Sequence, residues 1–440
     1  MNWRSLSVLL FGIALFYAPL AYGCTTNGTA LGLNILLLMA AAAALIHKVL
    51  ARESFHVSPF PLVCVLILAA IGAAHVFNAR FEVNEKTLDF IPRGKAIPFL
   101  PSALDRISAH SSAFGFFALA AAFLVLIDLM QHRNERWKIL GLVAISGFVV
   151  ALLGICLKLG KYPTLPFSPS VNRYFFATYV YHGNAAAFLN LCWPAALALL
   201  GRSIQEGNFL GRAFWANGFL FTFGALFVNA SKFGHAMAIP AVLLGALLVW
   251  RCIKTGMGTT SPVVIATTVA VVLVALTILI LPMLAVSTER WGLLVDQGES
   301  SRPITYGAAL RMIPDAPLWG IGPGCFRWGF PFYTAQLGDA IKGVWIHAHQ
   351  DYIETFVEWG IIGGMIWVSL LGTGIFRGWS KLFGGARELS TVAAVVAISV
   401  TLVHCMVDFP LQIPSLRYLA AIYFAILWGS RAKHRRLAPE

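Results

Sequence analysis

The chain has 440 residues, of which 58% are hydrophobic and only 12% are charged, and its mean hydropathy is +0.76. Because soluble domains carry about twice that charged fraction, the composition excludes an ordinary soluble protein. The net charge of +13 is not accompanied by a basic face with interleaved aromatic residues, so no nucleic acid is expected as a partner.

Apolar runs of about 20 residues, the length of a membrane-crossing helix, recur along the whole chain. They are continuous rather than alternating, which excludes a transmembrane β-barrel. The run that follows Arg4 is interpreted as a retained first helix and not as a cleaved signal peptide. The predicted spans are roughly 5–23, 29–47, 57–77, 109–129, 138–157, 183–201, 214–230, 233–250, 262–284, 353–376, 390–409 and 414–430. The sequence thus predicts an all-α polytopic integral membrane protein, with residues 1–440 forming a single transmembrane domain of about twelve helices.

The distribution of basic residues predicts the orientation of these spans. The two tails and every second loop carry 17 of the 32 Lys and Arg residues but only 6 of the 19 Asp and Glu residues. Both termini are therefore expected in the cytoplasm. Three longer loops, about 78–108, 158–182 and 285–352, are expected on the opposite side, and the last of them is the expected extracytoplasmic catalytic loop.

The loop 285–352 ends in a polar segment with two histidines, where charge is costly unless function requires it. The imidazole of His349 can take a proton from an attacking hydroxyl, and Asp351 could orient it. Alternatively, Asp351 and Glu354 are simply favourable in the first turn of a helix. A third interpretation is a metal site, because His347, His349 and Asp351 would face one way in an extended segment.

Two cations are candidates for binding phosphate. Arg302 precedes the segment Pro-Leu-Trp-Gly-Ile-Gly-Pro-Gly at 317–324, and arginine suits bidentate contact with phosphate. The glycines allow a tight turn or a close approach to a ligand, but no Gly-Lys-Ser/Thr follows, so the segment is not a P-loop. Lys232 at the start of a span is either a second cation for a diphosphate or a lysine that snorkels to the interface.

Two further polar groups lie at the ends of spans. The first consists of Asn172, Arg173, His182 and Asn184, for which anchoring at the interface is the simpler interpretation. His404 and Asp408 are one helical turn apart and form the second. An acid beside a histidine at the end of a span is again a candidate site.

Together these segments resemble the O-antigen ligase and polymerase superfamily of bacterial envelope glycan enzymes. The likeness lies in Arg302 followed by 317–324 (Arg, then Pro-Leu-x-Gly-x-Gly-x-Gly), in 349–353 (His-Asn-x-x-Leu), in 358–363 (Glu-x-Gly-x-x-Gly), in 178–189 (Thr-Phe-Val-Asn-Arg-Asn-x-x-Ala-Gly-Tyr-Leu) and in 404–409 (His-x-x-x-Asp-Phe). Lys232 and His182 stand where the family pattern has arginine.

The resemblance implies a metal-independent, inverting glycosyltransferase without a cofactor, in the bacterial inner membrane with a periplasmic active site. Its donor would be a glycan on undecaprenyl diphosphate, and its acceptor a hydroxyl of lipid A-core or a comparable glycan, as in lipopolysaccharide biosynthesis. A glycan polymerase and a protein O-oligosaccharyltransferase are alternatives, because the motifs do not report the acceptor. A lipid-linked glycan flippase is the alternative that is not an enzyme. Catalytic roles are expected for His349, Arg302 and Asp351, and substrate binding for Lys232, His182, Arg173, Asn184, Glu358 and Asp408.

Overall fold

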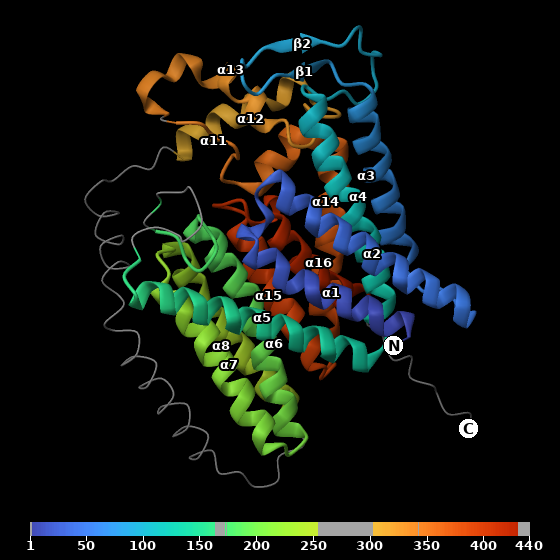
Figure 1. Ribbon diagram of the computed structural model, residues 1–440, viewed down its shortest axis with the longest axis vertical. Coiled ribbons are helices and arrows are strands. Elements are labelled where there is room, and N and C mark those ends of the chain that lie inside the picture. Colours follow the sequence, from blue (N-terminus) through green and yellow to red (C-terminus); the bar gives the residue numbers. More distant parts are fainter. Residues whose placement is uncertain (1, 163–171, 173, 254–301, 342, 430–440) are drawn as a thin grey trace.

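The computed structural model describes residues 2–162, 172, 174–253, 302–341 and 343–429, and the fold is given for these ranges (Figure 1). The long helices are α1 (Trp3–Leu20), α2 (Asn27–Ala51), α3 (Pro59–Phe77), α4 (Arg106–Leu129), α5 (Arg133–Leu159), α6 (His182–Gln205), α7 (Phe209–Val228), α8 (Lys232–Ile253), α14 (Asp351–Phe383), α15 (Leu389–His404) and α16 (Pro414–Gly429). Side-chain caps mark several of their starts. Asp105, for example, accepts hydrogen bonds from the amides of Ile107 and Ser108 at the start of α4.

The helices confirm an all-α membrane protein. In the described ranges eight of them are long and apolar enough to cross a membrane, namely α1 to α6, α8 and α14. Three other predicted spans coincide with α7, of 20 residues, and with α15 and α16, of 16 residues each. The predicted span 262–284 lies outside the described residues. The total of twelve spans therefore stays a prediction.

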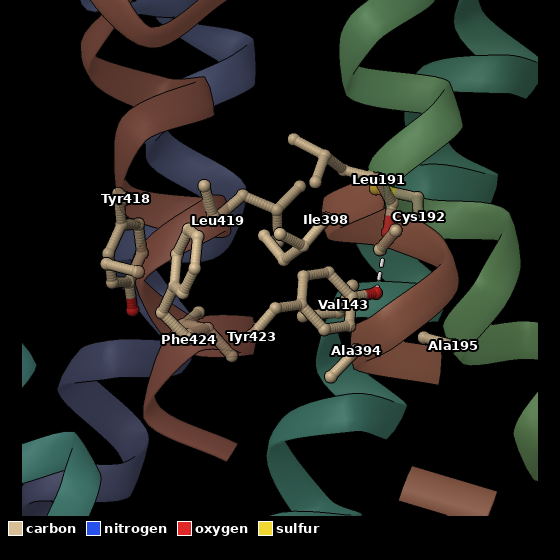
Figure 2. Packing of buried hydrophobic residues seen from close by; sticks show 14 of the residues in the cluster. Val143, Leu191, Cys192, Ala195, Ala394, Ile398, Tyr418, Leu419, Tyr423 and Phe424 are labelled. Carbon is tan, nitrogen blue, oxygen red and sulfur yellow. Dashed lines mark hydrogen bonds between the residues drawn. The ribbon is translucent and has the colours of Figure 1, made fainter. Parts of the chain in front are cut away.

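Helix α6 occupies the centre of the bundle. In its most apolar window 89% of the residues are buried, compared with 33–61% for the other seven candidate spans. Helices α5, α15 and α16 pack around it, and Figure 2 shows Val143, Leu191, Ile398 and Tyr423 from these four helices. The hydroxyl of Tyr423 donates a hydrogen bond to the carbonyl of Leu191 at 2.5 Å, so this buried phenol has a partner across the helix interface.

Short elements form a layer at one end of the bundle, which lies at the top of Figure 1. They are the hairpin β1 (Phe81–Val83) and β2 (Phe90–Pro92), the helices α11 (Arg302–Leu310), α12 (Phe326–Gly329) and α13 (Pro331–Thr334), and the 3₁₀ turns η3 (Ile313–Asp315) and η4 (Ala335–Ala340). Aromatic contacts hold the layer together. Phe90 meets Phe332 edge-on at 5.7 Å and Trp328 at 6.5 Å.

Helix α14 is broken at Gly360, whose φ of 65° and ψ of −173° are not helical. The glycine-rich segment at 317–324 docks into this break. The amides of Ile321 and Gly322 donate to the carbonyls of residues 357 and 358 at 3.0 Å, and the amide of Ile361 donates to the carbonyl of Pro317 at 2.8 Å. These bonds replace those that the helix loses at the break. The close approach made by Gly320 is therefore to α14, since a Cβ there would lie 2.4 Å from the carbonyl of Glu358.

Candidate functional site

Four segments that are distant in sequence meet beneath this layer. They are the turn before α6, the start of α11, the start of α14 and the loop that follows α15. Gln350 caps α14 by accepting a hydrogen bond from the amide of Ile353 at 2.5 Å. The amide of Asp351 donates to the carbonyls of Cys405 and Asp408 at 3.0 and 3.2 Å, which ties the start of α14 to the loop after α15. These contacts fix the position of His349.

His349 faces Asp408 across this junction. Its Nδ1 lies 3.3 Å from Oδ1 of Asp408, and its backbone adopts the left-handed conformation with a φ of 53°. The carbonyl of His349 accepts a hydrogen bond from the hydroxyl of Tyr306 at 2.8 Å, which holds this backbone geometry. The sequence suggested Asp351 as the residue that orients His349, but in the structure Asp408 is the carboxylate that faces this imidazole. The carboxylate of Asp351 instead accepts a hydrogen bond from the amide of Leu411 at 2.9 Å.

Asp408 is buried, and its Oδ2 has two further neighbours. The hydroxyl of Tyr181 donates to its Oδ2 at 2.9 Å, and Nε2 of His404 lies 3.8 Å from the same oxygen. Burial by itself raises the pKa of a carboxyl group. The hydrogen bond with His349, the nearby imidazole of His404 and the charge of Arg302 nevertheless hold the pKa of Asp408 well below its usual range. Asp408 is thus an anion at neutral pH, suited to orient an imidazole.

Arg302 joins the same network through Tyr181. Its guanidinium donates to the hydroxyl of Tyr181 at 3.3 Å and to the carbonyl of Val407 at 2.8 Å. Tyr181 therefore bridges the cation and the carboxylate. Its ring stacks on Phe409 at 5.6 Å and 7°, and the edge of Phe409 meets His349 at 4.6 Å. The sequence pointed to Arg302 and Asp408, but it gave no signal for Tyr181 beyond the position of this residue next to His182.

His347 stacks on Phe409 at 4.6 Å and 25°, and it pairs with a different carboxylate. Its Nδ1 is 2.7 Å from Oε1 of Glu354, whose other oxygen accepts from the amide of Ala348 at 2.7 Å. Burial lowers the pKa of an imidazole, but the charge of Glu354 and the hydrogen bond to it raise the pKa of His347 overall. The two histidines therefore have separate partners.

Glu358, which was predicted to bind substrate, contacts the backbone in the structure. Oε1 of Glu358 accepts a hydrogen bond from the amide of Phe326 at 3.0 Å, which fixes α12 to α14. Within the described residues no group of three or more His, Cys, Asp or Glu side chains has the spacing of a metal site. This agrees with the divergent partners of His347, His349 and Asp351, which do not converge on one point.

Three of the predicted substrate-binding residues lie at two neighbouring helix starts. His182 begins α6, where its ring contacts Tyr181 at 4.7 Å, and Asn184 is buried in the same turn. Lys232 begins α8, and the next residue, Phe233, packs on His404 at 5.1 Å. The start of α8 therefore adjoins the side of the site that carries Asp408. Arg173 lies outside the described residues.

Comparison with known proteins identifies part of the chain. Residues 218–368 match the model of a family described as O-antigen ligase, which confirms the resemblance drawn from the motifs. This match includes Lys232, Arg302 and His349, whereas Tyr181 and Asp408 lie outside it. A domain of this family indicates glycan transfer of the O-antigen ligase or polymerase type, with a lipid-linked glycan and an acceptor as substrates in general. No curated protein gives a significant match to the chain.

Proposed function

We propose that this chain, which carries an O-antigen ligase family domain, transfers a glycan from undecaprenyl diphosphate to a hydroxyl of lipid A-core or a comparable acceptor. The reaction takes place at the periplasmic face of the bacterial inner membrane. The observation that carries the proposal is the pairing of His349 with Asp408 beside Arg302. One group can act as a base and another can stabilise a leaving anion, which are the two requirements of this chemistry.

In the proposed mechanism Asp408 holds the proton of His349 on Nδ1, so that Nε2 presents its lone pair to the acceptor. The acceptor oxygen attacks the anomeric carbon as Nε2 takes its proton, and the bond from that carbon to the diphosphate oxygen breaks. Attack opposite the departing group inverts the configuration. The diphosphate leaves with the electron pair of that bond, and Arg302 and Lys232 stabilise its charge.

The first test removes the proposed base. His349→Ala should lower the rate of transfer by a factor of about 10²–10⁴, the usual contribution of a general base. The measurement uses purified protein in liposomes with an undecaprenyl-diphosphate glycan and lipid A-core. His347→Ala is the matched control because its imidazole pairs with Glu354 instead, and it should retain most of the rate. Wild-type transfer by His349→Ala would refute the proposed mechanism.

The second test identifies the acceptor. Lipopolysaccharide from a deletion strain, separated on a gel, should lack attached glycan while full-length glycan accumulates on undecaprenyl diphosphate. A single repeat attached to core would indicate a polymerase instead. Loss of glycan from protein alone would indicate a protein O-oligosaccharyltransferase, and trapping of the lipid-linked glycan on the cytoplasmic face would indicate a flippase.

A further inference from the structure

A cavity of about 380 Å³ lies within the bundle beside the proposed site. It is enclosed mainly by α4, α14 and α16, and His347 and Asp351 belong to its wall. His349, Arg302 and Asp408 are not part of this wall. The segment that carries the two histidines therefore has the cavity on one side and the His349–Asp408 pair on the other.

The cavity is long and mainly apolar. Along α14 its lining extends from Asp351 to Gly372, which at 1.5 Å per residue is about 30 Å. Aromatic side chains such as Phe116, Phe424 and Trp428 form much of the wall. Such a space suits one extended hydrocarbon chain, and an apolar wall of this kind does not hold water.

One side of the cavity reaches the lipid-facing surface of α14. Val368 and Gly372, one turn apart, both line the cavity and are exposed on the outside of the bundle, Val368 to 42%. Since α14 is a candidate membrane span, this surface meets the hydrocarbon of the bilayer. A lipid chain can therefore enter from the side.

The polar end of the cavity carries charged groups of both signs. Asp351, Glu354 and Glu358 contribute three buried carboxyl groups to its wall. The two guanidinium groups there have protein partners: Arg327 pairs with Glu85 at 3.3 Å, and Arg417 donates to the carbonyl of Gln412 at 2.9 Å. The third cationic group, His347, pairs with Glu354 at 2.7 Å, so the cations of this wall are already engaged and offer a diphosphate no net attraction. Carboxylates instead accept hydrogen bonds from hydroxyl groups, so a head group rich in hydroxyls fits it.

From this shape and charge we propose that the cavity binds one hydrocarbon chain of the acceptor lipid, with the hydroxyl-bearing head group beside His347. This inference rests on the proposed function and assigns the two lipid substrates to opposite sides of the histidine segment. The donor diphosphate takes the side with Arg302, and the acceptor takes the side with the carboxylates. Because His347 and His349 are two residues apart, their Cα atoms lie at most about 7 Å from each other.

The experiment fills the cavity from the side. Gly372 lines the cavity at its lateral opening and a Cβ there meets no atom within 4 Å, so Gly372→Ala, Gly372→Leu and Gly372→Phe add progressively larger side chains at this opening without a clash at the backbone. Gly28→Phe on α2 is the matched control, because Gly28 also has no atom within 4 Å of an added Cβ and does not line the cavity. Thermal melts of all four variants report whether the fold is kept.

Binding is measured without turnover in a His349→Ala background, by native mass spectrometry with lipid A-core, undecaprenyl diphosphate or phosphatidylethanolamine as the probe. Gly372→Phe should weaken binding of lipid A-core at least about tenfold, the factor expected when two methylene groups lose their contacts. The loss should grow from Ala to Phe, and binding of undecaprenyl diphosphate should not change. In the active protein the same substitution should raise the KM for the acceptor only.

Three results would overturn the inference. They are a selective loss of undecaprenyl diphosphate, an equal loss of phosphatidylethanolamine, and unchanged binding of lipid A-core by a folded Gly372→Phe protein. Because binding is read in a protein without the proposed base, these results are independent of whether His349 catalyses the transfer. Failure of the proposed function would appear separately, as undiminished turnover by His349→Ala.

Discussion

At the level of single side chains, Asp408 is the group on which the others converge. Its carboxylate accepts hydrogen bonds from the imidazole of His349 and from the hydroxyl of Tyr181. The hydroxyl of Tyr181 in turn accepts a hydrogen bond from the guanidinium of Arg302. A buried carboxylate needs such partners, since leaving it without them is costly. The same contacts fix the imidazole and the guanidinium relative to each other.

Tyr181→Phe tests this network because it removes the bridging hydroxyl and keeps the ring that stacks on Phe409. A hydrogen bond to a charged group contributes about 1.5–3 kcal/mol, so we expect kcat to fall about 10–100-fold. Assays of transfer over a range of donor concentrations separate kcat from KM. Tyr333→Phe, which loses a hydroxyl bonded to Asp315 on the outer layer, is the control and should behave as wild type. An unchanged kcat in Tyr181→Phe would mean that the hydroxyl is only structural.

The pairing of His347 with Glu354 predicts a pH dependence of stability. The pKa of His347 is raised above its ordinary value of about 6.5, so the stabilisation is fully present below that value and is lost as the pH rises through the folded-state pKa. Wild-type protein should therefore melt at a higher temperature than His347→Gln at about pH 5.5, and the difference should shrink towards about pH 9. A difference that grows with pH would contradict the assigned sign.

At the scale of elements, the break in helix α14 joins the bundle to the layer of short elements at its end. Gly360 interrupts it, and the segment at 317–324 enters the gap, so that the outer layer is bonded to the helix that begins at Asp351. The position of His349 relative to Arg302 depends on this joint. The Glu-x-Gly-x-x-Gly motif thus includes the glycine at which the helix opens.

Gly360→Ala should destabilise the protein. Its backbone conformation is one that only glycine adopts readily, at a cost of about 1–3 kcal/mol for other residues. In addition, an added Cβ would lie 2.4 Å from the carbonyl oxygen of Leu318. The melting temperature of the detergent-solubilised protein is the measurement. Gly28→Ala, where a Cβ has open space, should melt at or above the wild-type temperature. Equal melting of both variants would show that the break is not required.

At the scale of the whole molecule, the proposed reaction requires that the outer layer face the periplasm. Gln336 lies exposed in that layer and Gln205 lies exposed at the far end of α6. Of the described cysteines only Cys156 is exposed. In a Cys156→Ser background, Gln336→Cys should react with an impermeant thiol reagent in intact spheroplasts, and Gln205→Cys should react only after lysis. The reverse pattern would place the site on the cytoplasmic face and contradict the proposed donor.

The sequence by itself determined the class of molecule and most of its helices. Runs of apolar residues long enough to cross a bilayer have few alternatives to a helix, because every backbone polar group must be satisfied within the segment. For the same reason the predicted spans coincide with helices wherever residues are described. The sequence also singled out His349, Arg302 and Asp408, because charged and titratable groups are conspicuous beside apolar runs.

Only the tertiary structure decided how these residues combine. Sequence proximity suggested Asp351 as the partner of His349, but Asp408, 59 residues further along the chain, faces it. Tyr181 could not be recognised, because a tyrosine beside a span is usually an interfacial anchor. The break in α14 and the cavity beside it could likewise not be predicted from the sequence. Each depends on which helix faces lie together in space, and local hydropathy carries no information about that arrangement.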